Sequence, residues 1–462
     1  MGASLSSSVG IVSPPSIPSL SVSLPTPRTW LGSLARSSIL SFLEQAITVG
    51  HLTIVDNSIE YEFGELKTGG NEVRLVVIND NFWSRVLMSG DLGFSEAYMI
   101  GDVQVSNLKA VMDLWLDNQS GMSNLSLTAN KVASAFSGLS NAFTGQTKAR
   151  ARLNAIASYD QSNELFKAFL SKEMMYSTAL WSEAEGGVRG DLETGPRPGD
   201  LEAAQLRKIH HVLRKARVKP GSRLLEFGSG WGGLAIEAAR SFGCEVDTIT
   251  LSKEQKALAE ERIKEADLEG RVRVHLMDYR ELPPEFEKAF DAFVSIEMIE
   301  HVGSKHYKTY FSLVDWALKS DNAAAVVTSS TFPESRFSNY QAEDFMRRYM
   351  WPNSCLPSAT SLITAAHTAT QGRFTLEGVE NHASHYPRTL REWGRRLEKN
   401  LTVEMIAKDF PELRNNRSEF EAFKRKWQYL YAYAGAGFAK GYITCHMLTF
   451  VRQNDAPITP CY

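Results

Sequence analysis

The chain has 462 residues, 43% hydrophobic and 22% charged, with a formal net charge of -3 at pH 7. This composition is typical of a globular protein with two or three domains, and a near-neutral balance offers nucleic acid no basic surface. No apolar run reaches the roughly 18 residues of a membrane span. The four cysteines, Cys244, Cys355, Cys445 and Cys461, lack the paired spacing of metal ligands. We therefore expect no metal site and a reducing, cytoplasmic compartment.

Residues 1–46 are rich in Ser and Pro, and their first acidic residue is Glu44. We expect this segment to be disordered, because few large apolar groups are available to offset the entropy of ordering. Two other interpretations stay open. Arg28 and Arg36 in an acid-free stretch suit an organelle-targeting peptide, and Met1-Gly2 with Ser6 fits the N-myristoylation pattern.

The next part of the chain alternates short β-branched runs with Asn and Gly turns. This pattern predicts strands at 51–55, 59–63 and 73–78, followed by helices at 82–86, 94–98 and 108–116. Residues 47–118 are therefore predicted to form a small α+β domain. Residues 119–147, rich in Ser, Asn and Gly, are predicted to be a linker.

From residue 148 to residue 462 the pattern predicts a second, larger domain. A helix is expected at 201–216, and strands and helices then alternate at 223–227, 234–242, 245–250, 253–266, 272–277, 290–296, 307–318 and 324–329. Such alternation predicts an α/β fold with a doubly wound, Rossmann-like parallel sheet. Ligands of these sheets bind beyond the carboxyl ends of the strands, at the topological switch point.

One strand end carries a glycine cluster. Residues 223–237 read as a strand, a turn with Gly228, Gly230 and Gly232, and the start of a helix. Glycine is needed there because a side chain would block both the turn and a ligand's approach to the backbone. Polar residues end this strand and the two that follow it: Glu226, Thr250, Ser252, Gln255, Asp278 and Tyr279. One glycine turn with these polar ends suits a single nucleoside, and S-adenosylmethionine fits, with its methionine part at Glu226 and its adenine near Asp278.

Collinear motifs along the chain resemble one family, the cyclopropane-fatty-acyl-phospholipid synthases and mycolic acid cyclopropane synthases. They are Gly90–Val103, Ser158-Tyr-Asp, Met175-Tyr-Ser, Leu225–Gly233, Thr250–Gln255, Asp278-Tyr-Arg, Glu300-His-Val-Gly, Tyr349–Ser358 and His385-Tyr386 with Trp393. The resemblance implies a methyltransferase that uses S-adenosylmethionine, with Tyr176 and Ser177 as further cofactor contacts. It also implies phospholipid acyl chains as substrate, met at a membrane surface.

In that family an alkene attacks the cofactor's methyl group, and a carbocation then loses a proton to a bicarbonate ion. The resemblance implies that a cysteine, a glutamate, a histidine and a tyrosine hold this ion. Glu300 and Tyr386 match two of them, Thr178 stands in the cysteine's place, and no histidine occurs near Thr328. Tyr433 stands where the family has a further cysteine. Hydroxyls of Thr178, Thr328 and Ser330 are candidate donors to an anion.

With half of the cradle missing, bicarbonate is a doubtful cofactor, and ring closure and a methyl- or methylene-branched product both stay open. Glu300 itself is an alternative base. His301 is a candidate catalytic residue or a loop-stabilising one, and Glu297 is a structural or a cofactor-linked carboxylate.

Further alternatives concern the whole protein and its surface. The scaffold also suits a small-molecule N- or C-methyltransferase, or a lipid-binding protein with a degraded site. Two basic groups, on the helix at 206–219 and at Arg388, Arg391, Arg395 and Arg396, are either solvated faces or contacts for anionic lipid head groups. A homodimer is also left open.

Overall fold

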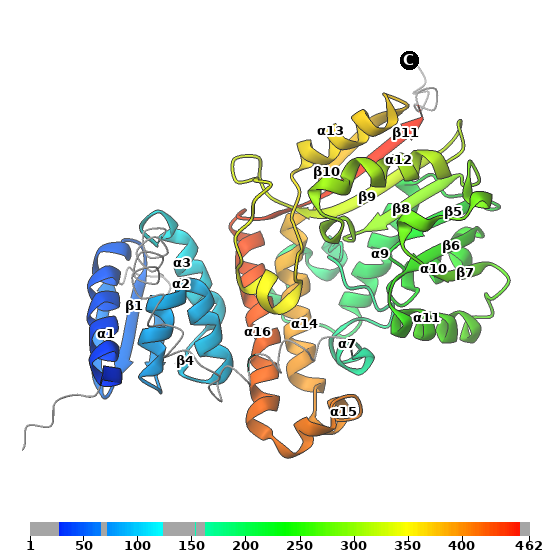
Figure 1. Ribbon diagram of the computed structural model, residues 1–462. Coiled ribbons are helices and arrows are strands. Elements are labelled where there is room, and N and C mark those ends of the chain that lie inside the picture. The colour runs from blue at the N-terminus through cyan, green and yellow to red at the C-terminus, as the bar shows by residue number, and fades with distance from the viewer. Residues whose placement is uncertain (1–26, 66–71, 123–152, 154–161, 453–462) are drawn as a thin grey trace, which may run out of the picture.

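The structure, a computed structural model, describes residues 27–65, 72–122, 153 and 162–452. Two sheets organise these residues, one of four strands near the N-terminus and one of seven strands in the rest of the chain. Figure 1 shows the N-terminal unit beside the larger unit, with the long helices α14 (Tyr386–Asn400) and α16 (Arg417–Ala439) between the two sheets.

The N-terminal unit has strand order β2-β1-β3-β4. Its elements are α1 (Pro27–Ala46), β1 (His51–Asp56), β2 (Ile59–Gly64), β3 (Glu72–Val77), α2 (Asn81–Ile100), β4 (Val103–Val105) and α3 (Leu108–Asp117). Asn57 and Ser58 join β1 to β2 with positive φ angles of 49° and 66°. Two such residues make the tight turn whose twist matches an antiparallel hairpin.

The prediction of disorder for residues 1–46 is wrong for α1. Ala35, Ile39, Leu43 and Ala46 recur at helical spacing and are buried in the core, and α1 lies against α2 and β2. Burial of this apolar stripe offsets the conformational entropy that is lost when the segment forms a helix. The Ser-rich composition had suggested that this entropy loss would keep the segment disordered. Residues 1–26 and most of the expected linker lie outside the described residues.

Helix α2 combines two predicted helices. The segments expected at 82–86 and 94–98 are parts of one element, kinked at Gly90, whose φ and ψ are 56° and −126°. Only glycine adopts that backbone conformation without strain, so the presence of glycine at position 90 accounts for the kink.

The larger unit contains the seven-stranded sheet, in the order β10-β11-β9-β8-β5-β6-β7. Its strands are β5 (Arg223–Phe227), β6 (Glu245–Thr250), β7 (Val272–Leu276), β8 (Ala292–Ile296), β9 (Ala324–Thr331), β10 (Phe374–Asn381) and β11 (Thr444–Arg452). Its remaining helices are α7 (Asn163–Phe169), α8 (Gly190–Glu193), α9 (Asp200–Lys215), α10 (Gly233–Phe242), α11 (Lys253–Glu265), α12 (Tyr307–Ala317), α13 (Ala359–Thr370) and α15 (Val403–Ile406).

Helices cover both faces of this sheet, which confirms the predicted doubly wound α/β fold. One apolar core joins α9, α10 and α11 to the sheet, and another joins α12 and α13 to its opposite face. Strands β5 to β9 pair in parallel, whereas β10 and β11 pair antiparallel at one edge. The sequence analysis missed this edge, because β10 and β11 are separated along the chain by α14, α15 and α16.

The strand order reverses at β5. From β5 the chain proceeds outward through β6 and β7, and it then returns to β8 on the other side of β5. A crevice therefore opens beyond the carboxyl ends of β5 and β8, which is where such folds bind ligands. The glycine turn follows β5, and Glu297 and Glu300 follow β8.

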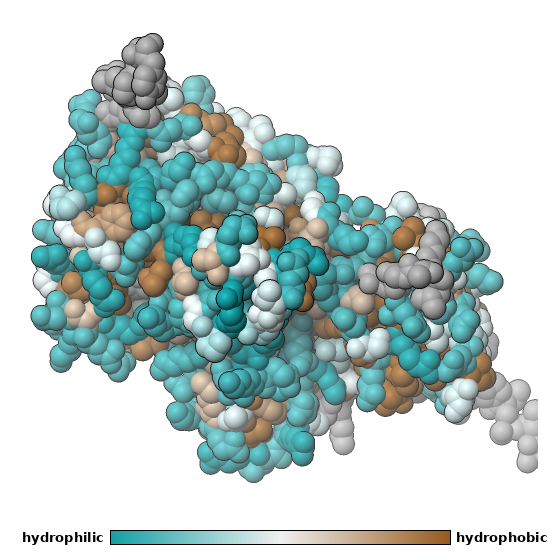
Figure 2. All heavy atoms as spheres, turned by 180° about the vertical axis from the view of Figure 1, so that it is seen from behind, coloured by the Kyte–Doolittle hydropathy of each residue, from teal (hydrophilic) through white to brown (hydrophobic). Residues whose placement is uncertain are grey.

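The apolar surface of the chain is largely internal. On the face in Figure 2, hydrophilic residues predominate and hydrophobic ones lie in small separate patches. None of the described helices combines the length and apolar character needed to span a bilayer.

Candidate active site

The glycine turn after β5 leaves room for a ligand. Gly228, Gly230 and Gly232 have φ angles of 91°, 48° and 80°, in the left-handed region that favours glycine. A Cβ at Gly230 would meet no atom within 4 Å. Nearby, Glu226 Oε2 and Ser229 Oγ are buried with no hydrogen-bond partner among the described residues. Burial raises the pKa of Glu226 to about 7.

The polar residues at the ends of β6 and β7 adjoin this turn. Thr250 Oγ1 donates to Gln255 Oε1 at 2.8 Å, and Ser252 caps α11 by accepting from the Gln255 amide. Asp278 accepts a hydrogen bond from the Arg280 amide at 2.9 Å. The ring of the remaining candidate, Tyr279, packs in the core against Phe227 and Tyr310, so it supports this region from beneath.

S-adenosylmethionine fits this arrangement. The open space at Gly230 admits a ligand to the backbone, and the Glu226 Oε2 atom, which has no hydrogen-bond partner among the described residues, suits a cationic amino group. Tyr176, a cofactor contact that the resemblance implies, packs against Trp393 with 5.3 Å between ring centroids.

Beyond β8, two carboxylates and their donors form a group that we call the carboxylate cluster: Glu297, Glu300, Thr178, Tyr386 and Cys445. The Thr178 amide donates to Glu297 Oε1 at 3.1 Å, and the Tyr386 hydroxyl donates to Glu297 Oε2. Cys445 Sγ lies 4.0 Å from Glu297 Oε1. Glu300 Oε1 accepts from the Ser330 amide at 2.6 Å. Burial raises the pKa of both carboxyls, to about 8 for Glu300.

The sequence analysis missed Lys208 as a member of this region. Lys208 is buried on α9, and its Nζ donates to Ser177 Oγ at 2.6 Å. Burial lowers its pKa to about 8, and the charges of Glu297 and Glu226 oppose that shift. The signal was present, because Lys208 falls at helical spacing with the buried Leu201, Ala204, Ile209 and Val212.

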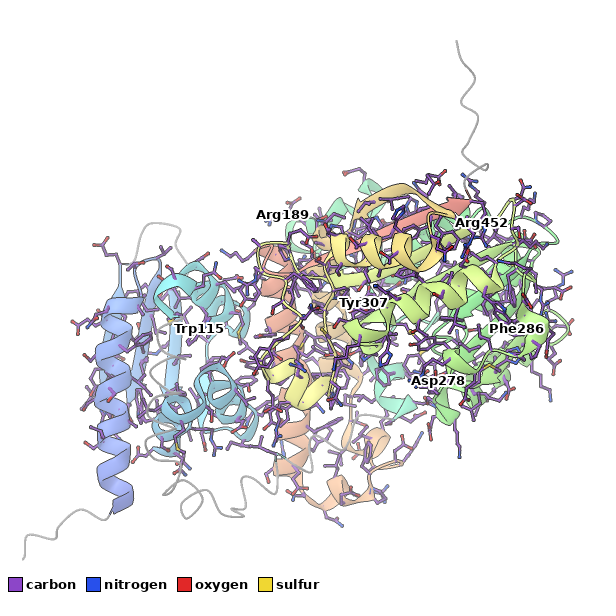
Figure 3. All side chains as sticks on the ribbon, turned by 45° about the horizontal axis from the view of Figure 1, so that its top comes forward. Trp115, Arg189, Asp278, Phe286, Tyr307 and Arg452 are labelled. Atoms are coloured by element: carbon purple, nitrogen blue, oxygen red, sulfur yellow. The ribbon has the colours of Figure 1, made fainter. Side chains whose placement is uncertain are left out.

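An apolar cavity of about 920 Å³ ends at the carboxylate cluster. Glu297, Glu300 and Tyr386 line it at one end, and the interior of the N-terminal unit lines it at the other, through Leu43, Leu52, Ile54, Leu75, Phe82 and Met112. The glycine turn meets the cluster end, because a Cβ at Gly228 would lie 3.3 Å from Met298 Cβ, next to Glu297. Figure 3 places Trp115, another lining residue, and Asp278 on opposite sides of α16. The cavity therefore links the N-terminal unit to the sheet's crevice.

The other predicted site residues differ in where they lie relative to this cavity and to the carboxylate cluster. His301 lies on its wall beside Trp351, with ring centroids 6.4 Å apart. The Thr178 hydroxyl points to the Ala179 carbonyl, so the backbone amide and not the hydroxyl serves the cluster. The Tyr433 hydroxyl donates to Asp344, outside the cluster. The motif at Ser158 lies outside the described residues.

The four arginines of α14 are engaged within the fold. Asp191 pairs with Arg388, Arg391 and Arg395, and Glu202 on α9 pairs with Arg396. On α9, Arg207 pairs with Glu185. These ion pairs give the paired arginines a structural role, and contact of the other basic residues at 206–219 with lipid head groups stays a prediction.

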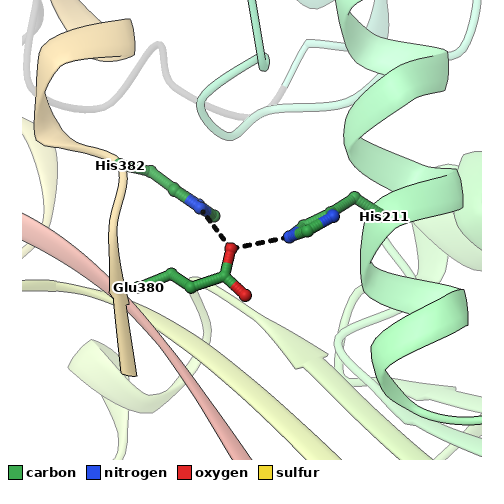
Figure 4. Close-up of side chains that lie close together, drawn as sticks. All are labelled: His211, Glu380 and His382. Atoms are coloured by element: carbon green, nitrogen blue, oxygen red, sulfur yellow. Dashed lines mark hydrogen bonds and ion pairs between the residues drawn. The ribbon is translucent and has the colours of Figure 1, made fainter. Parts of the chain in front are cut away.

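A second polar group ties α9 to β10. The Nε2 atoms of His211 and His382 lie 2.7 and 3.2 Å from the same oxygen of Glu380, as Figure 4 shows. These three side chains lie close enough to hold a metal ion. Lys215 Nζ, however, lies 2.7 Å from the other Glu380 oxygen and already neutralises the carboxylate. We interpret the group as an ionic tether between α9 and β10.

Comparison with known proteins agrees with this geometry. A family model described as mycolic acid cyclopropane synthetase matches residues 146–448. The cyclopropane-fatty-acyl-phospholipid synthase of Escherichia coli is 32% identical over 387 residues, covering 83% of this chain and 89% of that protein. The tuberculostearic acid methyltransferase UfaA1 of Mycobacterium tuberculosis is 31% identical over 377 residues, covering 80% and 81%. The solved cyclopropane synthase MmaA2 of M. tuberculosis superposes with a TM-score of 0.52 at 25% identity, covering 64% of this chain and 96% of its own.

The doubly wound sheet, the glycine turn and these relatives together define a methyltransferase that uses S-adenosylmethionine. Open space for a methyl donor at the glycine turn, a buried carboxylate pair and an apolar cavity meet the needs of methyl transfer to an apolar substrate. Within the class, the chain belongs to the mycolic acid cyclopropane synthetase family.

Proposed function

We propose that the protein transfers a methyl group from S-adenosylmethionine to the double bond of an unsaturated acyl chain carried by a phospholipid. The observation that carries this proposal is the apolar cavity that ends at the carboxylate cluster beside the glycine turn. Its volume of about 920 Å³ lies near the top of the range of about 300–1,000 Å³ for small-molecule sites. The Escherichia coli and M. tuberculosis relatives are a cyclopropane-fatty-acyl-phospholipid synthase and a tuberculostearic acid methyltransferase, which supports the same substrate class.

The residues of the chain supply a dry slot and a place for a proton. Bound S-adenosylmethionine supplies an electrophilic methyl group. Apolar side chains near Tyr386, such as Leu390 and Phe438, keep water from the electron-deficient carbon that the substrate develops after methyl transfer. Glu297, Glu300 and Tyr386 are the titratable groups at the reacting end.

The mouth of the cavity suits a phosphate head group. Arg336 and Arg347 line it, and the buried Nε of Arg347 has no hydrogen-bond partner among the described residues. Tyr340, on the same loop, is 82% exposed. An exposed tyrosine and two arginines that line the same cavity match the amphipathic and cationic groups that dock proteins on anionic membranes, so we propose peripheral membrane contact around Tyr340.

The test is product formation on defined vesicles. Purified protein is incubated with methyl-labelled S-adenosylmethionine and vesicles of palmitoyl-oleoyl phosphatidylglycerol, and the lipids are analysed by mass spectrometry. We expect label in the oleoyl chain with a mass gain of one methylene group, and none with dipalmitoyl vesicles. Absence of label from a protein that binds the cofactor by calorimetry would reject the proposed substrate. Light scattering on the same sample tests whether the protein forms a homodimer, which the sequence leaves open.

A further inference from the structure

The backbone at Glu297 is held in an unusual conformation. Its φ angle of 50° lies in the left-handed region, which costs a residue with a side chain about 1–2 kcal/mol. The Glu297 amide donates to the Thr328 carbonyl at 3.0 Å, which fixes the turn directly after β8. Strain retained at the end of a strand that faces the ligand crevice indicates a functional position.

The carboxylate of Glu297 occupies the place expected for an external anion. Two of the positions that the sequence resemblance assigns to an anion cradle, Thr178 and Tyr386, both donate hydrogen bonds to Glu297. The Tyr386 ring is fixed for this contact by parallel stacking on Phe438, with centroids 4.0 Å apart. The donors that would hold a small anion are therefore already satisfied by a carboxylate of the chain itself.

We infer that Glu297 is the catalytic base of the reaction and that the protein needs no bicarbonate. This inference rests on the proposed function. The alkene π electrons form a bond to the transferred methyl carbon while the carbon–sulfur bond of the cofactor breaks, leaving a carbocation on the neighbouring acyl carbon. A C–H bond next to that cation then breaks, its electron pair fills the empty orbital, and its proton passes to the Glu297 carboxylate. Loss from the new methyl group closes a cyclopropane ring, and loss from an adjacent chain carbon leaves an alkene.

The neighbouring groups place the negative charge on Glu297 and not on Glu300. Two carboxyls buried this closely do not both ionise, so one holds a proton. Glu297 receives hydrogen bonds from Thr178 and Tyr386 and feels the charge of Lys208. Glu300 receives one from Ser330, and its Oε2 has no partner among the described residues. The carboxylate with two hydrogen-bond donors and the lysine charge beside it is the one that is ionised and able to accept a proton.

Two variants and two anions test the inference. In buffer depleted of carbon dioxide, wild-type activity on oleoyl vesicles is expected to be unchanged. Glu297→Gln keeps the shape but not the base, so we expect activity to fall by about 100-fold or more. Glu297→Gly relieves the strained φ and empties the anion position, and we expect added formate or bicarbonate to restore part of its activity.

Anion binding is measured independently of turnover. Calorimetry is expected to detect formate binding to Glu297→Gly and not to the wild type, while both bind S-adenosylmethionine with affinities within about threefold, which also shows that the variant folds. Wild-type activity that requires bicarbonate, formate binding to the wild type, or full activity of Glu297→Gln would each overturn the inference. If the wild type labels no unsaturated lipid at all, it is the proposed function that fails. A wild type that labels lipid only with added bicarbonate refutes the inference alone.

Discussion

The ammonium group of Lys208 donates a hydrogen bond to Ser177 Oγ at 2.6 Å, between α9 and the segment that carries Tyr176. A buried, ionised lysine lowers the free energy of unfolding unless nearby negative charges compensate it, because burial penalises the ionised form. Here the charge faces Glu297 and Glu226. Lys208 therefore acts as a positioning residue that favours two carboxylates in their ionised forms.

Replacement of Lys208 with Met tests that role. Without the positive charge the pKa of Glu297 rises, so the acid limb of the kcat/KM profile moves to higher pH. We expect the rate at a fixed pH on that limb to fall by about tenfold. The matched control is Lys215→Met, since Lys215 lies on the same helix but pairs with Glu380. If the acid limb of the kcat/KM profile did not move in Lys208→Met, the role of Lys208 would be packing alone.

Glu300 makes stability depend on pH. Burial, followed by the charge of Glu297, raises its pKa from the usual 4.5 to about 8. Its contribution to stability is therefore present below pH 4.5 and is lost as pH rises through 8, by at most about 1.4 kcal/mol per pH unit. Urea unfolding followed by circular dichroism should show that Glu300→Gln flattens this decline, and the exposed Glu287→Gln should not. Some slope should remain, because Glu226 titrates in the same window.

Two glycines of the turn should respond differently to alanine. At Gly233 a Cβ would lie 2.1 Å from the Glu173 carbonyl oxygen, so Gly233→Ala should lower the free energy of unfolding by about 3 kcal/mol. At Gly230 the space is open, so Gly230→Ala should cost only the backbone strain of about 1–2 kcal/mol but obstruct the cofactor. Gly221→Ala, also at positive φ in open space but at the opposite end of β5, controls for strain. Equal cofactor affinity in Gly230→Ala and Gly221→Ala would contradict this placement of the ligand.

The N-terminal end of the cavity should set acyl-chain length. Met112→Trp narrows it, so the ratio of product from palmitoleoyl over oleoyl lipids should rise about tenfold. Leu52→Phe is a milder second variant if the first is unstable. Val49→Trp, at an exposed position of the same unit, is the control. An unchanged ratio in competition assays would show that the acyl tail lies elsewhere.

The tether at Glu380 should stabilise the fold at neutral pH. Burial raises its pKa, but hydrogen bonds with Lys215 and His211 outweigh that effect and lower it to about 2. The stabilisation is thus present above pH 4.5 and disappears as pH falls towards 2. Glu380→Gln should lose about 1 kcal/mol at pH 7 and little at pH 3, as measured by urea unfolding. Added Zn²⁺ should leave the midpoint unchanged, and a rise would indicate a metal site instead.

Local sequence patterns were sufficient to predict the parallel strands of the large sheet and the glycine turn. Alternation of apolar runs and helices across 223–329 predicted β5 to β9, because each element's own residues carry its period. Gly228, Gly230 and Gly232 predicted the turn, because only a few backbone conformations suit a strand that leads straight into a helix.

Tertiary structure decided what those elements do together. The role of Glu297 depends on donors at Thr178 and Tyr386, which lie 119 and 89 positions away along the chain. The cavity depends on α1, whose apolar stripe lies within a Ser-rich segment, and on α16 packed beside the N-terminal unit. Sequence alone determined the family and predicted the turn at which we expect the cofactor to bind. Long-range packing determined which groups surround each buried carboxylate, because the charge on a buried group depends on neighbours that the chain brings together only by folding.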